Sequence, residues 1–333
     1  MIKTFLATLS PMISLFLFMA IGFLIKKLNI LPESSGKVLA KLETYVFVPA
    51  LSFVTMATNC TPKTLTIHLT NIVISSVGVI IAVTIATILS GLFVKEKSME
   101  RGVYKYALTF GNSGYVGDPL VNTIHGDVML SYYKMYTLPL SVAIYTWGLS
   151  TLIPKDKGKN PLLSLLNPPV ISLLIGIVFG LLGILNFLPD VLYSAVYSTL
   201  NSLKGCVGPV AMLLAGITIA SYNFREMLSD KKVYITTFLR LVAIPAVIIS
   251  ALFGVKELIN YVFSLSISNT PLFLCFFAVA APLGLNTVVF PEAYGGNPKT
   301  GAAMTMISHT LCVITIPLLY SLMVLIFGEP VIA

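Results

Sequence analysis

The stretch Phe110-Gly-Asn-Ser-Gly-Tyr-Val-Gly-Asp-Pro-Leu120 interrupts a segment, from about residue 101 to 124, that is otherwise apolar enough to cross a membrane. Glycine lowers helix propensity, and Pro119 also removes a backbone donor. In hydrocarbon, freed backbone groups are tolerated only where they are buried in protein or face a watery cavity. The stretch therefore predicts a broken spanning helix of the kind that forms transport sites. A kinked structural helix with closely packed glycines is the alternative.

The composition indicates an integral membrane protein. Of 333 residues, 56% are hydrophobic and only 10% are charged, and the mean hydropathy is +0.93. A soluble protein of this size carries far more charge. At about 20 residues per spanning helix, the length allows roughly ten helices. The net charge of +8 comes from short loops between apolar segments, which favours membrane orientation and not nucleic-acid binding as its explanation.

Metal, redox and enzymatic roles find no support in the sequence. The four cysteines form no CxxC or CxxH pair, the three histidines fall in separate segments, and no nucleophile motif is present. We therefore expect no enzyme and no cofactor, apart from a coupling ion, H⁺ or Na⁺.

The apolar pattern predicts an all-α membrane protein with ten transmembrane helices. They cover residues 5–28, 38–57, 67–94, 101–124, 129–153, 169–187, 192–222, 233–253, 271–294 and 301–327, with a short surface segment at 257–266. Most Lys and Arg residues fall in alternate loops, which predicts both termini on the outer side of the cell membrane. Residues 1–153 and 169–333, joined by a cytoplasmic linker at 154–168, would then be two inverted five-helix repeats.

A weak internal echo supports the repeat. Phe47-Val-Pro-Ala50 in the second segment corresponds to Val207-Gly-Pro-Val210 in the seventh, and the broken fourth segment has a counterpart at Ala281–Pro291 in the ninth. Interrupted segments at corresponding places in two inverted halves point to a binding site where they cross.

Several motifs resemble those of the auxin efflux carrier family. Gly111-Asn-Ser-Gly-Tyr-Val-Gly-Asp-Pro119 resembles its Asn-x-Gly-[Phe/Tyr]-x-Gly-x-Pro signature, and Pro49-Ala-Leu-Ser-Phe53, Asn167-Pro-Pro169 and Thr315-Ile-Pro317 follow in the family's order. In that family the position of Asp118 is commonly small or apolar.

The resemblance implies a fold like bacterial sodium/proton antiporters and bile-acid symporters, with crossed helices 4 and 9. Helices 1, 2, 6 and 7 would form a scaffold and a homodimer interface, and helices 3–5 and 8–10 a moving transport unit. Family members carry organic anions, auxin in plants and malate, malonate or similar carboxylates in bacteria. The short linker here is typical of a microbial member.

The predicted substrate-binding residues come from both breaks. Amide, hydroxyl and backbone N–H groups suit a carboxylate, and a half-helix N-terminus adds a favourable dipole. The resemblance places Asn112 first among them. The candidates are Asn112, Ser113, Gly114, Pro282, Asn286 and Thr287, and the residues expected to form the breaks are Gly111, Gly117, Pro119, Gly284 and Pro291. Helix capping or a proline kink is the structural alternative.

Three residues are candidates for ion coupling. Asp118 in mid-membrane must pair, titrate or bind a cation; Glu292 and His309 are the others. The alternatives are a salt bridge for Asp118, a solvated or Lys299-paired role for Glu292, and a neutral, hydrogen-bonded ring for His309.

Other polar residues in apolar segments are expected to play structural roles. Arg240 could balance a substrate carboxylate, but we expect it to reach the inner surface by snorkelling, and we expect Lys134 and Lys204 to contact outer headgroups. Tyr145 and Trp147 are expected to serve in packing and as interface anchors.

The sequence thus predicts a secondary active transporter of small organic anions that works by elevator-type alternating access, with the substrate and the lipid bilayer as partners. A cation/proton antiporter on the same scaffold and a ligand-binding membrane sensor are the alternatives.

Overall fold

The computed structural model describes residues 1–96, 98–154, 165–222, 229–264, 266–294 and 298–331, without the side chains of 292–294, and its secondary-structure elements there are all helices. In chain order they are α1 (Ile2–Lys27), α2 (Ser35–Leu42), α3 (Val48–Asn59), α4 (Leu65–Phe93), α5 (Met99–Thr109), α6 (Asp118–Ala143), α7 (Leu149–Leu152), α9 (Pro168–Leu182), α10 (Asp190–Ala220), α12 (Lys231–Phe238), α13 (Ile244–Phe263), α14 (Thr270–Val279), α15 (Asn286–Tyr294) and α16 (Lys299–Phe327), with a 3₁₀ turn at Ile184–Phe187.

Six helical spans in the described chain are long and apolar enough to cross a membrane. They are α1, the α2–α3 span Ser35–Asn59, α4, α10, the α12–α13 span Lys231–Phe263, and α16. Large apolar side chains along α4, such as Val73, Ile80 and Leu92, are exposed, as lipid-facing positions require. The protein is therefore a multi-pass membrane protein. The segment 257–266, expected to be short and to lie at the surface, is not separate from the preceding span, because α13 continues to Phe263; Leu258, Tyr261 and Phe263 within it are exposed.

Four π-helical turns lie within these spans, at Glu43–Phe47, Ser113–Gly117, Ile144–Gly148 and Leu239–Ala243. Three of them are followed two residues later by a proline: Pro49, Pro119 and Pro245. A proline ring clashes with the carbonyl four residues earlier, and a wider turn there relieves the clash. The prolines therefore account for the local geometry without ending the helix.

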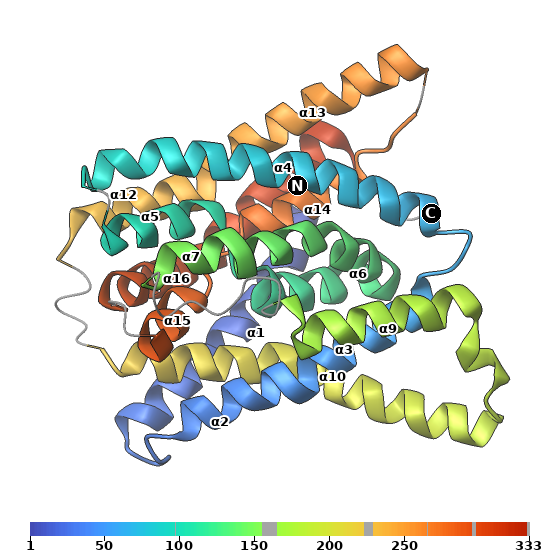
Figure 1. The fold of residues 1–333 in the computed structure, drawn as a ribbon, viewed down its shortest axis with the longest axis horizontal. Helices are drawn as coiled ribbons and strands as arrows, with labels where there is room; N and C mark the ends of the chain where they lie inside the picture. Colours follow the sequence, from blue (N-terminus) through green and yellow to red (C-terminus); the bar gives the residue numbers. More distant parts are fainter. Residues whose placement is uncertain (97, 155–164, 223–228, 265, 295–297, 332–333) are drawn as a thin grey trace.

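Two helix pairs approach each other closely through glycines. A side chain at Gly22 of α1 would overlap the Leu213 backbone of α10, and one at Gly180 of α9 would overlap backbone oxygens of α3. In Figure 1, α2, α3 and α10 lie along one edge of the molecule and α4 and α13 along the opposite edge. The α1/α10 and α3/α9 pairs form a tightly packed block.

The two predicted breaks exist, and they meet. The chain leaves the helix between Thr109 and Ser113 and again between Val279 and Asn286. Gly111 pairs with Leu283 in an antiparallel bridge, and the Asn112 N–H donates to the Pro282 carbonyl at 2.6 Å. We call this contact the crossover.

Both breaks are shorter than predicted. Gly117 and Pro119 belong to the helical stretch after the first break, and Pro291 lies inside α15. This stretch continues along α6 to Gly126, where a φ of 79° and a ψ of −172° bend the chain. Glycine adopts such a conformation at no steric cost, so α6 comprises two helical stretches that meet at this kink.

Candidate functional site

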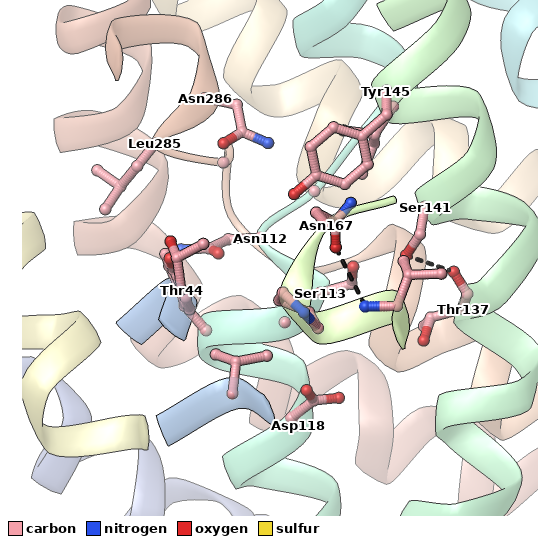
Figure 2. Close-up of a pocket in the computed structure, with 18 of the residues that line it drawn as sticks. Thr44, Asn112, Ser113, Asp118, Thr137, Ser141, Tyr145, Asn167, Leu285 and Asn286 are labelled. Carbon is pink, nitrogen blue, oxygen red and sulfur yellow. Dashed lines mark hydrogen bonds between the residues drawn. The ribbon is translucent and has the colours of Figure 1, made fainter. Parts of the chain in front are cut away.

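A cavity of about 160 Å³ adjoins the crossover. Asn112, Ser113 and Gly114 line it from the first break, and Gly284 and Asn286 line it from the second. Its remaining lining residues are Thr44, Val48, Gly111, Tyr115, Asp118, Lys134, Thr137, Ser141, Ile144, Tyr145, Asn167, Pro169, Val170 and Leu285. Figure 2 shows the side chains of Asn112, Asn286, Asn167 and Tyr145 around this hollow. Residues remote in sequence thus contribute amides and hydroxyls to one small space.

Asn112 is held by His309 of α16. The His309 Nδ1 lies 2.8 Å from the Thr305 carbonyl oxygen, and because a carbonyl only accepts, Nδ1 carries the proton. In a neutral ring Nε2 is then an acceptor, so the Asn112 Nδ2 donates to it at 3.3 Å. The structure thus gives His309 a role in orienting Asn112, and ion coupling through His309 stays a prediction.

Three other predicted residues of the second break have distinct positions. Asn286 lines the cavity, and its Nδ2 donates to the Tyr106 hydroxyl at 2.9 Å. Thr287 is fully buried and donates to the Gly284 carbonyl at 3.0 Å, so it closes the turn into α15. Pro282 contributes the carbonyl of the crossover hydrogen bond. Neither Thr287 nor Pro282 is among the described cavity-lining residues.

The crossover brings four helix ends together, and a guanidinium compensates the two negative ones. The stretch that begins at Ser113 and the helix α15 direct their N-terminal, partly positive ends to the cavity side. The C-terminal ends of α5 and α14 are partly negative. Arg240, in the π turn before α13, donates from Nη1 to the Thr109 carbonyl at 3.3 Å, and a side chain at Gly111 would overlap its Nη2 and the Ala281 carbonyl oxygen. The guanidinium therefore lies where the two negative ends converge.

The prediction that Arg240 snorkels to the inner surface is consequently wrong. Its exposure is 1%. The snorkelling prediction relied on the short distance along the chain from Arg240 to Lys231-Lys232. That distance could not indicate the negative potential of the two helix C-termini, which stabilises the guanidinium inside the protein.

Asp118 and Lys134 form a buried ion pair on the cavity wall. The Lys134 Nζ lies 2.9 Å from the Asp118 Oδ2, and both residues line the cavity. The prediction that Lys134 contacts outer headgroups is wrong, because the opposite charge within the protein is the closer partner. Asp118 therefore forms the salt bridge that was the alternative to ion coupling. A role of Asp118 in ion coupling stays a prediction.

A second cavity, of about 340 Å³, lies on the other face of the same helical stretch. Pro119, Asn122 and Thr123 line it opposite residues of α1, α3 and α10. Lys204 of α10 also lines it and pairs with Asp127 of α6. The prediction that Lys204 reaches outer headgroups is therefore wrong as well.

Glu43 is a buried carboxylate that the sequence analysis missed. It starts the first π turn, its exposure is 0%, and neither carboxylate oxygen has a hydrogen-bond partner in the described part of the chain. The side chain of Glu292 lies outside the described residues. Among those residues, no group of three or more His, Cys, Asp or Glu could hold a metal ion.

A partial signal existed for the missed residues. Glu43, Lys134 and Arg240 are charged residues inside apolar segments, which is by itself a functional indication. Thr44 and Tyr145 carried no such signal, because hydroxyl-bearing side chains are common in spanning helices.

A family model described as a membrane transport protein matches the chain in two parts, residues 7–161 and 156–320. An uncharacterized transporter of Methanocaldococcus jannaschii is 24% identical over 206 residues, which span 60% of this chain and 65% of that protein. An uncharacterized transporter of Methanothermobacter thermautotrophicus is 22% identical over 231 residues, which span 68% of this chain and 72% of that protein. The alignment thus covers about two thirds of either relative.

Proposed function

Because this chain belongs to the membrane transport protein family, which is the auxin efflux carrier family, we propose that it is a secondary active transporter of small organic anions. It is a transporter and not an enzyme. Mono- or dicarboxylates of malate-like or auxin-like kind are the proposed cargo, bound at the crossover.

The observation that carries this proposal is the antiparallel contact of Gly111 with Leu283 beside a cavity lined by amides. Both helical stretches that begin at the breaks present N-terminal ends there, and such ends favour an anion. Asn112, Asn286 and Ser113 add side-chain groups that bind a carboxylate without a buried charge of their own.

We further propose ten spans in two inverted repeats, residues 1–153 and 169–333, joined by the linker 154–168. The separate family matches in the two halves support this division. The helix packing supports it too. The first span, α1, packs against the seventh, α10, and the sixth span, α9, packs against the second, α3. In a five-helix repeat the first span corresponds to the sixth and the second to the seventh, so the two packed pairs are equivalent.

In this arrangement α1, α2–α3, α9 and α10 form a scaffold that also makes a homodimer, and the other helices move against it as an elevator-type transport unit in the cell membrane. Both termini lie outside. A cation/proton antiporter is less well supported, because the described cavity lining contains one carboxylate, Asp118, and not a paired acidic centre.

Ligand-dependent thermal stabilisation of the purified protein tests the proposal. The probes are acetate, malonate, malate and indole-3-acetate, each as the sodium and the N-methylglucamine salt. We expect at least one of them to stabilise the wild type, and Asn112→Ala to lose that effect with an affinity loss of about tenfold or more. Asn71→Ala, at an equally buried asparagine of α4 outside the described cavity lining, is the control. Wild-type protein that responds to no carboxylate would overturn the proposal.

A further inference from the structure

The cavity contains one opposite-charge pair whose two members differ in accessibility. The side chain of Lys134 is 11% exposed and that of Asp118 only 1%. Among the described lining residues Lys134 is the only basic side chain. Of the two lining residues, Lys134 is therefore the more accessible and Asp118 the more deeply buried.

The hydrogen bonds of the pair are incomplete. The Lys134 ammonium donates to the Asp118 Oδ2, and this is the one hydrogen bond that its side chain makes within the described residues. The Asp118 Oδ1 is buried and has no partner in the same part of the chain. An ammonium has three N–H groups and a carboxylate accepts several hydrogen bonds, so both members of this pair on the cavity wall have unused hydrogen-bonding capacity.

From this geometry we propose that Lys134 binds the carboxylate of the substrate, and that Asp118, its partner in the empty site, takes up a proton when the substrate replaces it. This inference rests on the proposed function and assigns its charge-bearing residue and its coupling ion. A sodium ion is not required, because the positive charge is supplied by the chain.

The charge balance follows from the cost of burial. In the empty site the pair is neutral. A substrate carboxylate that engages the ammonium leaves Asp118 as a buried, unpaired anion, which is strongly unfavourable. A proton from the solution that the cavity faces neutralises it at a carboxylate oxygen, while the ammonium keeps its three protons. One proton therefore crosses with each substrate, and a monocarboxylate is carried without net charge.

The other titratable and charged groups of the surrounding elements do not replace either partner. They are Tyr133 on α6, Lys204 on α10, Cys275 on α14, His68 on α4, His309 on α16, Arg240 before α13 and Glu43 before α3. The ammonium of Lys204 is paired with Asp127.

Binding measurements with the same four carboxylates test the role of Lys134. We expect Lys134→Met to weaken binding by about 10- to 100-fold and Lys134→Arg to retain most of it. Lys256→Met is the matched control, because Lys256 is buried to a similar degree and ion-paired, but lies on α13 beside Glu257, outside the described lining. The double variant Asp118→Asn/Lys134→Met, which has no unpaired charge, should fold and still fail to bind.

Uptake into proteoliposomes tests the role of Asp118. In the wild type, uptake of a carboxylate that binds, measured as the excess over protein-free liposomes, should carry protons, and for a monocarboxylate it should be insensitive to an imposed membrane potential. In Asp118→Asn it should carry no protons and depend on the potential, and Asp127→Asn should behave as the wild type.

The outcomes separate the two claims. If the wild type binds a carboxylate and Lys134→Met binds it with unchanged affinity, or if Asp118→Asn still moves protons, this inference is overturned and the proposed function stands. If the wild type binds none of the probes, the proposed function itself fails.

Discussion

Glu43, Asp118 and Arg240 are all buried, and each has a different electrostatic environment. Asp118 has the Lys134 ammonium at 2.9 Å. Arg240 has a backbone carbonyl at 3.3 Å and two converging helix C-termini. Glu43 has no hydrogen-bond partner in the described chain. A buried polar group without a partner destabilises the fold, so Glu43 is the residue whose removal should help stability.

We predict that Glu43→Met raises the stability of the folded protein by about 1–3 kcal/mol, because an apolar side chain of similar size replaces a carboxyl group that has no partner. Thermal unfolding in detergent measures the change. Glu33→Met, at an exposed glutamate, should leave the midpoint unchanged. A clear fall in the Glu43→Met midpoint would show that the carboxyl group has a stabilising partner.

At the scale of the elements, the crossover depends on close backbone approach at a single position. Gly111 forms the bridge to Leu283. A Cβ atom there would overlap the Arg240 Nη2 and lie 2.9 Å from the Ala281 carbonyl oxygen. Gly114, one turn further and also on the cavity wall, has no atom within 4 Å of such a Cβ. Close packing therefore requires glycine at position 111, whereas position 114 has room for a larger side chain.

We therefore predict that Gly111→Ala destabilises the protein by about 1–3 kcal/mol, since the extra methyl group overfills a packed site. Gly114→Ala should keep the wild-type unfolding midpoint and act as the matched control. Size-exclusion profiles and thermal midpoints of the two variants provide the measurement. Equal stability of both would mean that the breaks do not approach as closely as described.

At the scale of the whole molecule, two cavities lie on the two faces of the helical stretch from Ser113 to Gly126. Ser113, Gly114 and Asp118 line one, and Pro119, Asn122 and Thr123 line the other. Helices α1, α3 and α10, which we propose as part of the scaffold, form the opposite wall of the second cavity. A movement of the crossover against the scaffold would close one cavity and open the other, as alternating access requires.

Cysteine labelling from each side of the membrane tests this. In a background without the four native cysteines, we predict that Ser141→Cys, in the first cavity, reacts with an impermeant maleimide from one side, and Asn122→Cys, in the second, from the other. A transported carboxylate should change the two rates in opposite directions. Parallel changes, or labelling of both from one side, would contradict the mechanism.

Local properties of the sequence were enough to predict the class of protein and the two breaks. Apolar segment length, loop charge and the glycines and prolines near Gly111 and Gly284 act within a few residues, so they predicted a helical, multi-pass membrane protein interrupted at these places. They did not predict where each break ends, because Pro119 is accommodated by a π-helical turn and does not end the helix.

The tertiary structure decided which side chains share the site. His309 reaches Asn112 across 197 positions of sequence, Arg240 compensates the ends of helices far from it in the chain, and Lys134 faces Asp118 and not the lipid headgroups. These contacts depend on the rotation of each helix about its axis and on which helices are neighbours. Packing of the complete bundle sets both, and no single segment contains that information.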